Sequence, residues 1–111
     1  MIEIEAILDS DGVIRACKAA GHAGAGKAGT DVVCAAVSVL FRTALNVLSG
    51  REGIVFKGGA PEKGRLWLET EYNEKGKDFL FAVGEFLIYG FSSVVQEFPD
   101  NCKLTIRNIS S

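Results

Sequence analysis

One segment of this 111-residue chain combines a thiol, an imidazole and a run of glycines. His22 is the only histidine of the sequence, and Cys34 follows it twelve positions later. A cysteine thiolate is a strong nucleophile, and a neighbouring imidazole can take its proton and later protonate a leaving group. The two residue types together predict a Cys–His hydrolase site, with Cys34 as the nucleophile and His22 as the base.

The pattern after this segment predicts that Cys34 lies in the first turn of a long helix. Thr30 or Asp31 offers a side-chain oxygen for the N-cap, apolar residues then recur at helical spacing, and Gly50 ends the pattern. The unpaired N–H groups of a first turn favour a thiolate and can also hold an oxyanion. The alternative is that Cys34 simply fills a core position, as small apolar cysteines often do.

A glycine-rich loop, residues 21–29 with the sequence GHAGAGKAG, joins the preceding strand to this helix. Glycines allow sharp turns and let a substrate backbone come close. We therefore expect a substrate loop, and its glycines are Gly21, Gly24, Gly26 and Gly29. Such a loop can bring His22 against Cys34, although a solvent-exposed loop histidine is the alternative interpretation.

Two polar residues near Cys34 are candidates for supporting roles. Asp31 can orient the imidazole of His22, or it can merely suit the positive end of the helix. Ser38 lies one turn beyond Cys34 on the same face. It can hydrogen-bond within the site or bond back to the carbonyl of Cys34. Both interpretations stay open for each residue.

The order of these residues resembles the ribosomal-processing cysteine protease family. Residues 21–24 (GHAG) and 29–38 (GTDVVCAAVS) follow its pattern of a GHA segment and then G-x-D-x-x-C-A-A-x-S. The resemblance implies a homodimeric Cys–His endopeptidase that removes the N-terminal extension of a large-subunit ribosomal protein precursor, cutting after an aromatic residue. It also implies that His22 and Cys34 are the catalytic pair, with Asp31 and Ser38 in support.

Other kinds of site fit the residues less well. A zinc site needs three or four close ligands, and the cysteines at positions 17, 34 and 102 are scattered, so we expect no metal and no cofactor. Residues 21–27 match the start of a phosphate loop, but Ala28 stands where its hydroxyl belongs. A phosphate-loop nucleotide binder is thus a weak alternative. A non-enzymatic ribosome-assembly factor, which would bind the precursor without cutting it, is the stronger one.

Composition places the chain among single-domain proteins spanning residues 1–111. The net charge of −2, with both signs mixed, argues against direct nucleic-acid binding. The start MIEIE lacks the basic residues of a signal peptide, so we expect a cytoplasmic protein with free thiols. Residues 79–98 are apolar enough to span a bilayer, but Glu85 would be costly there, so we expect a packed helix and no membrane.

Apolar periodicity predicts the element order ββαββαβ, an α/β (α+β) fold made of a two-layer sandwich with one mixed sheet and two helices. The predicted strands are residues 2–8, 13–19, 54–57, 65–70 and 103–107, with a loop at 58–64. The predicted helices run from Thr30 or Asp31 to about residue 49 and over residues 77–97. The second helix carries more apolar surface than one sheet face can cover, which predicts a homodimer.

Overall fold

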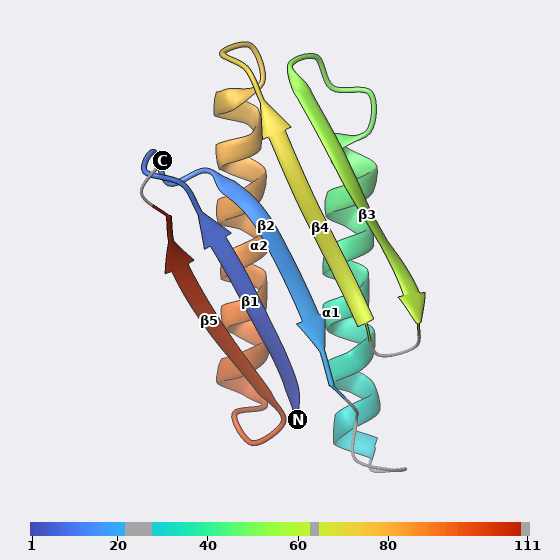
Figure 1. Ribbon diagram of the computed structural model, residues 1–111. Helices are drawn as coiled ribbons and strands as arrows, with labels where there is room; N and C mark the ends of the chain where they lie inside the picture. The colour runs from blue at the N-terminus through green and yellow to red at the C-terminus, as the bar shows by residue number, and fades with distance from the viewer. Residues whose placement is uncertain (22–27, 63–64, 110–111) are drawn as a thin grey trace.

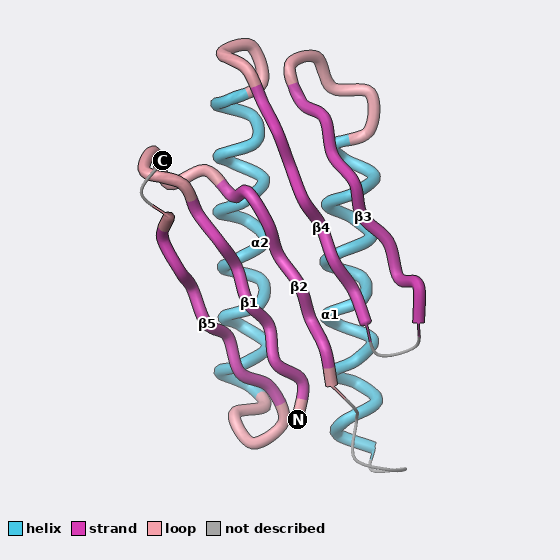
Figure 2. The backbone as a smooth tube through the Cα atoms, viewed as in Figure 1, coloured by secondary structure: helices cyan, strands magenta, loops and turns pink. Residues whose placement is uncertain are grey.

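The computed structural model describes residues 1–21, 28–62 and 65–109, and for residues 28–31 and 60–62 it describes the backbone alone. Within them, five strands form one sheet, and both helices pack on the same face of it (Figures 1 and 2). The elements are β1 (Ile2–Leu8), β2 (Ile14–Ala20), α1 (Ala28–Leu48), β3 (Ile54–Glu62), β4 (Arg65–Tyr72), α2 (Lys77–Glu97) and β5 (Cys102–Asn108). The predicted order and the two-layer sandwich are confirmed.

The order of strands across the sheet is β3-β4-β2-β1-β5. β1 and β5 run parallel, and the other neighbouring pairs are antiparallel, so the sheet is mixed. α1 carries the chain from β2 past β4 to the outer strand β3, and α2 carries it from β4 to β5 at the opposite edge. As a result, the end of β2 and the beginning of α1 lie at the same end of the molecule (Figure 1).

β1 has the alternation that its sequence predicts. Ile2, Ile4 and Ala6 are buried beneath the helices. Glu3 and Glu5 alternate with them, and successive side chains of a strand point to opposite faces, so both acids lie on the face that carries no helix. The burial of this one row fixes which side of the sheet forms the core.

The helix-free face of the sheet is covered by charged side chains. Glu5 of β1 lies 3.6 Å from Lys18 of β2 and 3.0 Å from Arg107 of β5, measured between nitrogen and oxygen. Lys57 of β3 stands opposite Glu69 of β4 in the ladder. Opposite charges on facing strands support the pairing register. This face is therefore a solvated surface of the folded chain.

The core lies between the sheet and the two helices. α1 contributes a buried stripe of Val33, Val37, Phe41, Ala44 and Leu48. Val47 lies outside this stripe and is 39% exposed. The ring of Phe41 lies 5.3 Å from that of Phe91 in α2 and joins the two helices.

α2 approaches its neighbours through two glycines. A Cβ at Gly84 would lie 2.9 Å from the side chain of Ile14 in β2, and one at Gly90 would lie 2.8 Å from Leu40 of α1. α2 thus packs on both the sheet and α1, but Phe86 remains 71% exposed. Among the described residues, α2 is the helix that is long and apolar enough to cross a membrane by length and composition.

The predicted bounds of β2, β4 and β5 are off by one or two residues, and two other boundaries are wrong by more. α1 begins at Ala28, before either residue that was expected to cap it. β3 continues through Glu62, whereas residues 58–64 were predicted as a loop. This extension pairs with β4, since Gly58 stands opposite Leu68. A Cβ at Gly58 would lie 2.7 Å from Leu45 of α1, so this strand glycine marks a close approach of the helix and not a turn.

Candidate active site

Cys34 is the seventh residue of α1 and lies in its second turn. The prediction that it lies in the first turn is wrong, because the helix begins at Ala28 and not at the expected cap. The effect of the helix dipole falls off beyond the first turn, so it helps the thiolate less than predicted. The amide of a residue at this depth is engaged in the helix, which leaves it unable to hold an oxyanion.

Cys34 is half-buried and packs against the hydrophobic core from its edge. Its neighbour Val33 is fully buried, which fixes how this part of α1 faces the sheet. Ser38, four residues on, is also half-buried and lies on the same side of the helix as Cys34. Leu45 continues that side and contacts Gly58 of β3. The thiol therefore lies on the side of α1 that is turned toward the edge strand.

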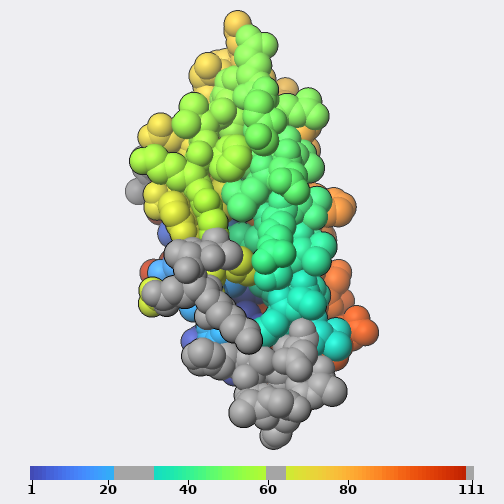
Figure 3. Space-filling view, turned by 90° about the vertical axis from the view of Figure 1, so that its right-hand side faces the viewer, coloured from blue at the N-terminus to red at the C-terminus, as the bar shows by residue number. Residues whose placement is uncertain are grey.

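Figure 3 views the molecule from this side, with α1 in teal and green beside the yellow-green strands β3 and β4. The end of β2 lies at the same end of the molecule as the beginning of α1 (Figure 1).

The predicted site residues fall into three groups. Cys34, Ser38 and Gly21 are described with their surroundings. His22, Gly24 and Gly26 lie outside the described residues, as does the side chain of Asp31. The prediction that Gly29 belongs to the loop is wrong, because Gly29 lies in the first turn of α1. The pairing of His22 with Cys34 stays a prediction.

Cys17 and Cys102 differ from Cys34 in burial. All three cysteines are described, and all are free thiols. Cys17 is 2% exposed and Cys102 is 1% exposed, so both pack within the core. Burial, with a smaller contribution from the charge of Glu5, raises the pKa of Cys17 to about 12. Burial also raises the pKa of Cys102 above its ordinary value, although a backbone hydrogen bond lowers it in part.

These differences predict that iodoacetamide will label Cys34 at least about 10-fold faster than Cys17 or Cys102 at pH 8, because the thiolate is the reacting species and burial suppresses it. Peptide mapping of the labelled native protein would measure the three rates. Labelling in guanidinium chloride is the control, and there the rates should converge. Equal rates in the native protein would contradict the assignment of Cys34 as the accessible thiol.

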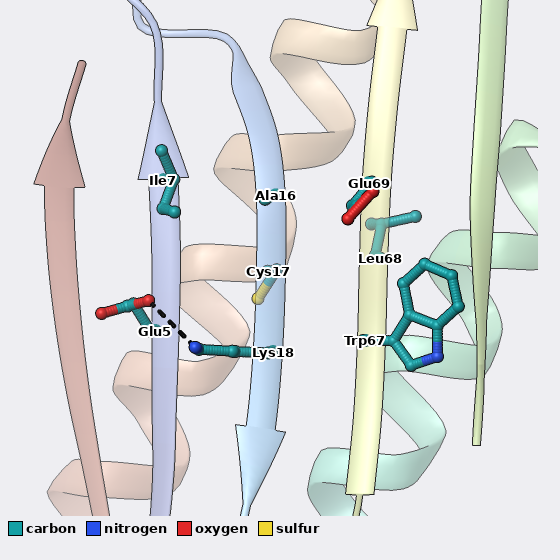
Figure 4. Close-up of a pocket in the computed structure, with 8 residues that line it drawn as sticks. All are labelled: Glu5, Ile7, Ala16, Cys17, Lys18, Trp67, Leu68 and Glu69. Atoms are coloured by element: carbon teal, nitrogen blue, oxygen red, sulfur yellow. Dashed lines mark ion pairs between the residues drawn. The ribbon is translucent and has the colours of Figure 1, made fainter. Parts of the chain in front are cut away.

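A shallow groove of about 220 Å³ lies on the helix-free face of the sheet. Figure 4 shows Glu5, Lys18 and Trp67 projecting around it from β1, β2 and β4. Because α1 covers the opposite face, this groove is separated from Cys34 by the sheet itself. Within the described ranges, no group of three or more His, Cys, Asp and Glu side chains is placed to hold a metal ion.

Comparison with known proteins decides the family. The model of the family described as Cysteine protease Prp matches residues 1–103. The chain belongs to the Prp family. No match was found among curated proteins. The similarity of residues 21–38 to the ribosomal-processing cysteine proteases is therefore confirmed as a family relationship, and Prp membership makes the chain a cysteine protease by family.

Solved structures share the Prp fold. SMU.848 from Streptococcus mutans is 24% identical, with a TM-score of 0.80, over 98% of this chain and 96% of that chain. The ribosomal processing protease Prp from S. aureus, in complex with a substrate peptide, is 18% identical, with a TM-score of 0.81, over 96% of this chain and 100% of that chain. The same S. aureus protease with a covalently linked product peptide is 18% identical, with a TM-score of 0.79, over 96% of this chain and 100% of that chain. At these identities the likeness establishes the fold.

Proposed function

We propose that this chain is a Cys–His endopeptidase that removes the N-terminal extension of a large-subunit ribosomal protein precursor, cutting after an aromatic residue. The observation that carries the proposal is the thiol of Cys34, which is half-buried at the edge of the core, on the side of α1 turned toward the edge strand. Membership of the Prp family supports the protease chemistry. Ser38, on the same side of α1, and Asp31 are proposed to support the pair.

The proposed reaction is acyl transfer. His22 takes the proton of Cys34, and the thiolate attacks the scissile carbonyl carbon to form a carbon–sulfur bond. The carbon–nitrogen bond then breaks, and the imidazolium of His22 protonates the departing amine. The neutral imidazole then takes a proton from water, and the water oxygen attacks the carbonyl carbon of the thioester. The carbon–sulfur bond breaks, and the imidazolium returns the proton to sulfur. Because the amide of Cys34 is engaged in α1, it cannot serve as a donor to the oxyanion.

The substrate is the part of the proposal that rests on relatives. The S. aureus protease of the same fold is described as a ribosomal processing protease and was crystallised with a substrate peptide and with a covalently linked product peptide. A covalently linked peptide is what nucleophilic catalysis by a cysteine would leave on the enzyme. We extend this substrate class to the present chain, and we place its action in the cytoplasm.

Incubation with a ribosomal precursor, followed by mass spectrometry, tests the proposal. The wild-type protein should release the extension in one cut after an aromatic residue, whereas a Cys34→Ala variant should leave the precursor intact. A wild-type protein that binds the precursor but never shortens it would support the assembly-factor alternative instead. A wild-type protein that neither binds nor cuts would refute the proposed substrate.

The proposed enzyme is a homodimer that buries the outer helix face, which we define as the exposed side chains of Val32, Val39, Phe86 and Tyr89. Val39 is 61% exposed, and Tyr89 is 70% exposed. Phe86 and Tyr89 point away from the stripe of α2 that packs on the core. Aromatic side chains at this level of exposure are typical anchors of a two-fold interface.

Phe86→Glu should raise the dissociation constant of this dimer by about 30-fold or more, because an aromatic anchor would be replaced by a charge. Light scattering over a micromolar concentration series would measure it. Val55→Glu is the matched control, since Val55 is 65% exposed but lies on β3, away from the outer helix face. A wild-type protein that stays at monomer mass throughout would remove the dimer from the proposal.

A further inference from the structure

β5 lies at one edge of the sheet, and within the described residues it pairs with β1 alone. Its register with β1 continues without a shift along the whole strand, so its outer side presents an uninterrupted row of main-chain groups. The other edge strand, β3, has a register shift between Gly59 and Glu62 and contains Pro61, which has no N–H. Such irregularities commonly close a sheet edge to further pairing. β5 is therefore the open edge of this sheet (Figure 1).

Hydrogen bonds at both ends of β5 show which of its main-chain groups face outward. The carbonyl oxygen of Asn101 accepts a hydrogen bond of 2.9 Å from the N–H of Ile2. The N–H of Ile109 donates one of 2.8 Å to the carbonyl oxygen of Leu8. Because the N–H and C=O groups of successive strand residues point alternately to the two sides, the odd-numbered residues of β5 turn toward β1. Even-numbered residues such as Ile106 therefore direct these groups away from the sheet.

An apolar side chain is exposed on the helix side of this edge. Ile106 pairs with Ala6 of β1, so the two side chains lie on the same face of the sheet. Ala6 is completely buried, whereas Ile106 is 44% exposed. Leu104 pairs with Ile4 and is half-buried on the same face. The apolar layer of the core thus continues as far as β5, where it is only partly covered.

The other face of β5, which carries no helix, is positively charged. Lys103 and Arg107 are both exposed and lie on either side of Thr105. Arg107 is 3.0 Å from Glu5 of β1. Among the described residues, Lys103 has no ion-pair partner. A strand laid along the outer side of β5 would therefore meet two positive charges on this face.

We propose that the outer edge of β5 is a docking site for an extended segment of a partner protein in which acidic residues alternate with apolar ones. The main chain of the segment would pair with the outward groups of β5. Its apolar side chains would cover Leu104 and Ile106, and its carboxylates would face Lys103 and Arg107. β1 has the same alternation of acidic and apolar residues, and it occupies the other side of β5.

The same charges disfavour a second copy of this chain as the occupant. If two β5 strands paired antiparallel about Thr105, Lys103 of each copy would stand opposite Arg107 of the other. Like charges directly opposite one another are destabilising. The docking site is also separate from the proposed catalytic function, because Cys34 lies on the side of α1 turned toward β3, at the opposite edge of the sheet.

The probe is a short synthetic peptide of alternating Glu and Val residues, and the measurement is amide hydrogen exchange followed by NMR. At saturation the peptide should slow exchange at the outward N–H groups of Leu104 and Ile106 by at least about 10-fold. Thr105, whose N–H already faces β1, should change little. A peptide with Lys in place of Glu is the control and should give no protection.

Three results of this experiment would overturn the proposal. The first is no protection of β5 by the Glu–Val peptide, and the second is equal protection by the Lys–Val peptide. The third is protection of Leu104 and Ile106 that rises with protein concentration in the absence of peptide, since it would make a second copy the occupant.

Two substitutions test the charge and the main chain separately, with fluorescence anisotropy of the labelled peptide as the readout. Lys103→Glu should raise the dissociation constant of the Glu–Val peptide by at least about 10-fold. Lys57→Glu makes the same change at an exposed position of β3, and it should bind like the wild type. Wild-type affinity in Lys103→Glu would overturn the proposal.

Ile106→Pro removes an outward N–H without removing a hydrogen bond to β1, and proline is tolerated at such positions of edge strands. Ile106→Ala removes the same apolar side chain but keeps the N–H. The proline variant should bind the peptide at least several-fold more weakly than the alanine variant. Equal affinity in the two folded variants would reject main-chain pairing, and if the proline variant does not fold, the exchange of Leu104 and Ile106 in the wild type decides the same point.

Discussion

Cys34→Ser should lower kcat for precursor cleavage by at least about 10³-fold, because a hydroxyl is far less acidic than a thiol and a nearby imidazole cannot hold it ionised. The fold should be unaffected, since the side chain is nearly isosteric and only half-buried. Single-turnover cleavage followed by mass spectrometry gives the rate, and thermal unfolding checks the fold. His22→Ala should cause a loss of the same order, because both residues act in one proton transfer.

Ala35→Ser is the matched control for this substitution. It introduces the same hydroxyl at an exposed neighbouring position of α1, and it should leave kcat unchanged. Wild-type turnover in Cys34→Ser would contradict the role of Cys34 as nucleophile. Asp31→Asn distinguishes the two interpretations of Asp31, since a partial loss of kcat is expected if its carboxylate orients His22.

Much of the fold could be predicted because local patterns determined it. In β1, the alternation of Ile2, Glu3 and Ile4 gave the correct strand with the correct buried face. The apolar run of α2 gave its bounds, since Pro99 and the turn after it stop the helix. These elements depend on hydrophobic periodicity and on breakers, both of which are visible in a short window of sequence.

The errors concern contacts between segments that are distant in sequence. Gly58 and its neighbours looked like a loop because glycine normally weakens a strand, yet this stretch pairs with β4 under Leu45 of α1. The order of strands likewise depends on where each crossover helix finds a sheet face to cover. The start of α1 at Ala28 also differs from the predicted cap at Thr30 or Asp31.

In the candidate site, too, local sequence patterns predicted some features, whereas contacts between distant segments could not be predicted. The residue types and spacing of His22 and Cys34 identified the chemistry, because few other residues of the chain can serve as nucleophile or base. The contact of Gly21 with the main chain of Met1 could not be foreseen, since it requires the pairing of β1 with β2. A glycine directly after a predicted strand was the one available signal.

The structure also contains a buried polar cluster centred on Asp9. Asp9, in the turn between β1 and β2, is 4% exposed. Its carboxylate accepts hydrogen bonds from the amides of Asp11 (2.9 Å) and Val13 (3.0 Å) and from the hydroxyl of Tyr72 in β4. The guanidinium of Arg15 lies 3.9 Å away. The cluster ties the turn of the first hairpin to the end of β4.

The protonation of Asp9 is coupled to folding. Burial raises the pKa of the Asp9 carboxyl, but the hydrogen bonds from Tyr72, Val13 and Asp11 and the charge of Arg15 together outweigh burial and lower the pKa below its ordinary value of 3.8. The unfolded chain therefore binds this proton more readily than the folded one. The contribution of the Asp9 carboxylate to the free energy of unfolding is fully present above about pH 4, and it is lost as the pH falls through the pKa that Asp9 has in the folded chain.

Asp9→Ala should accordingly lower the free energy of unfolding at pH 7 by about 2–4 kcal/mol, because it leaves buried donors unpaired and Arg15 without its carboxylate. Urea denaturation at pH 7 and at pH 3 measures the effect, and the difference between variant and wild type should shrink at pH 3. Asp100→Ala, at an exposed turn, is the control and should change stability little at either pH. A difference that grew in acid would show that the folded chain favours the protonated carboxyl of Asp9, contrary to its lowered pKa and to the geometry of its hydrogen bonds.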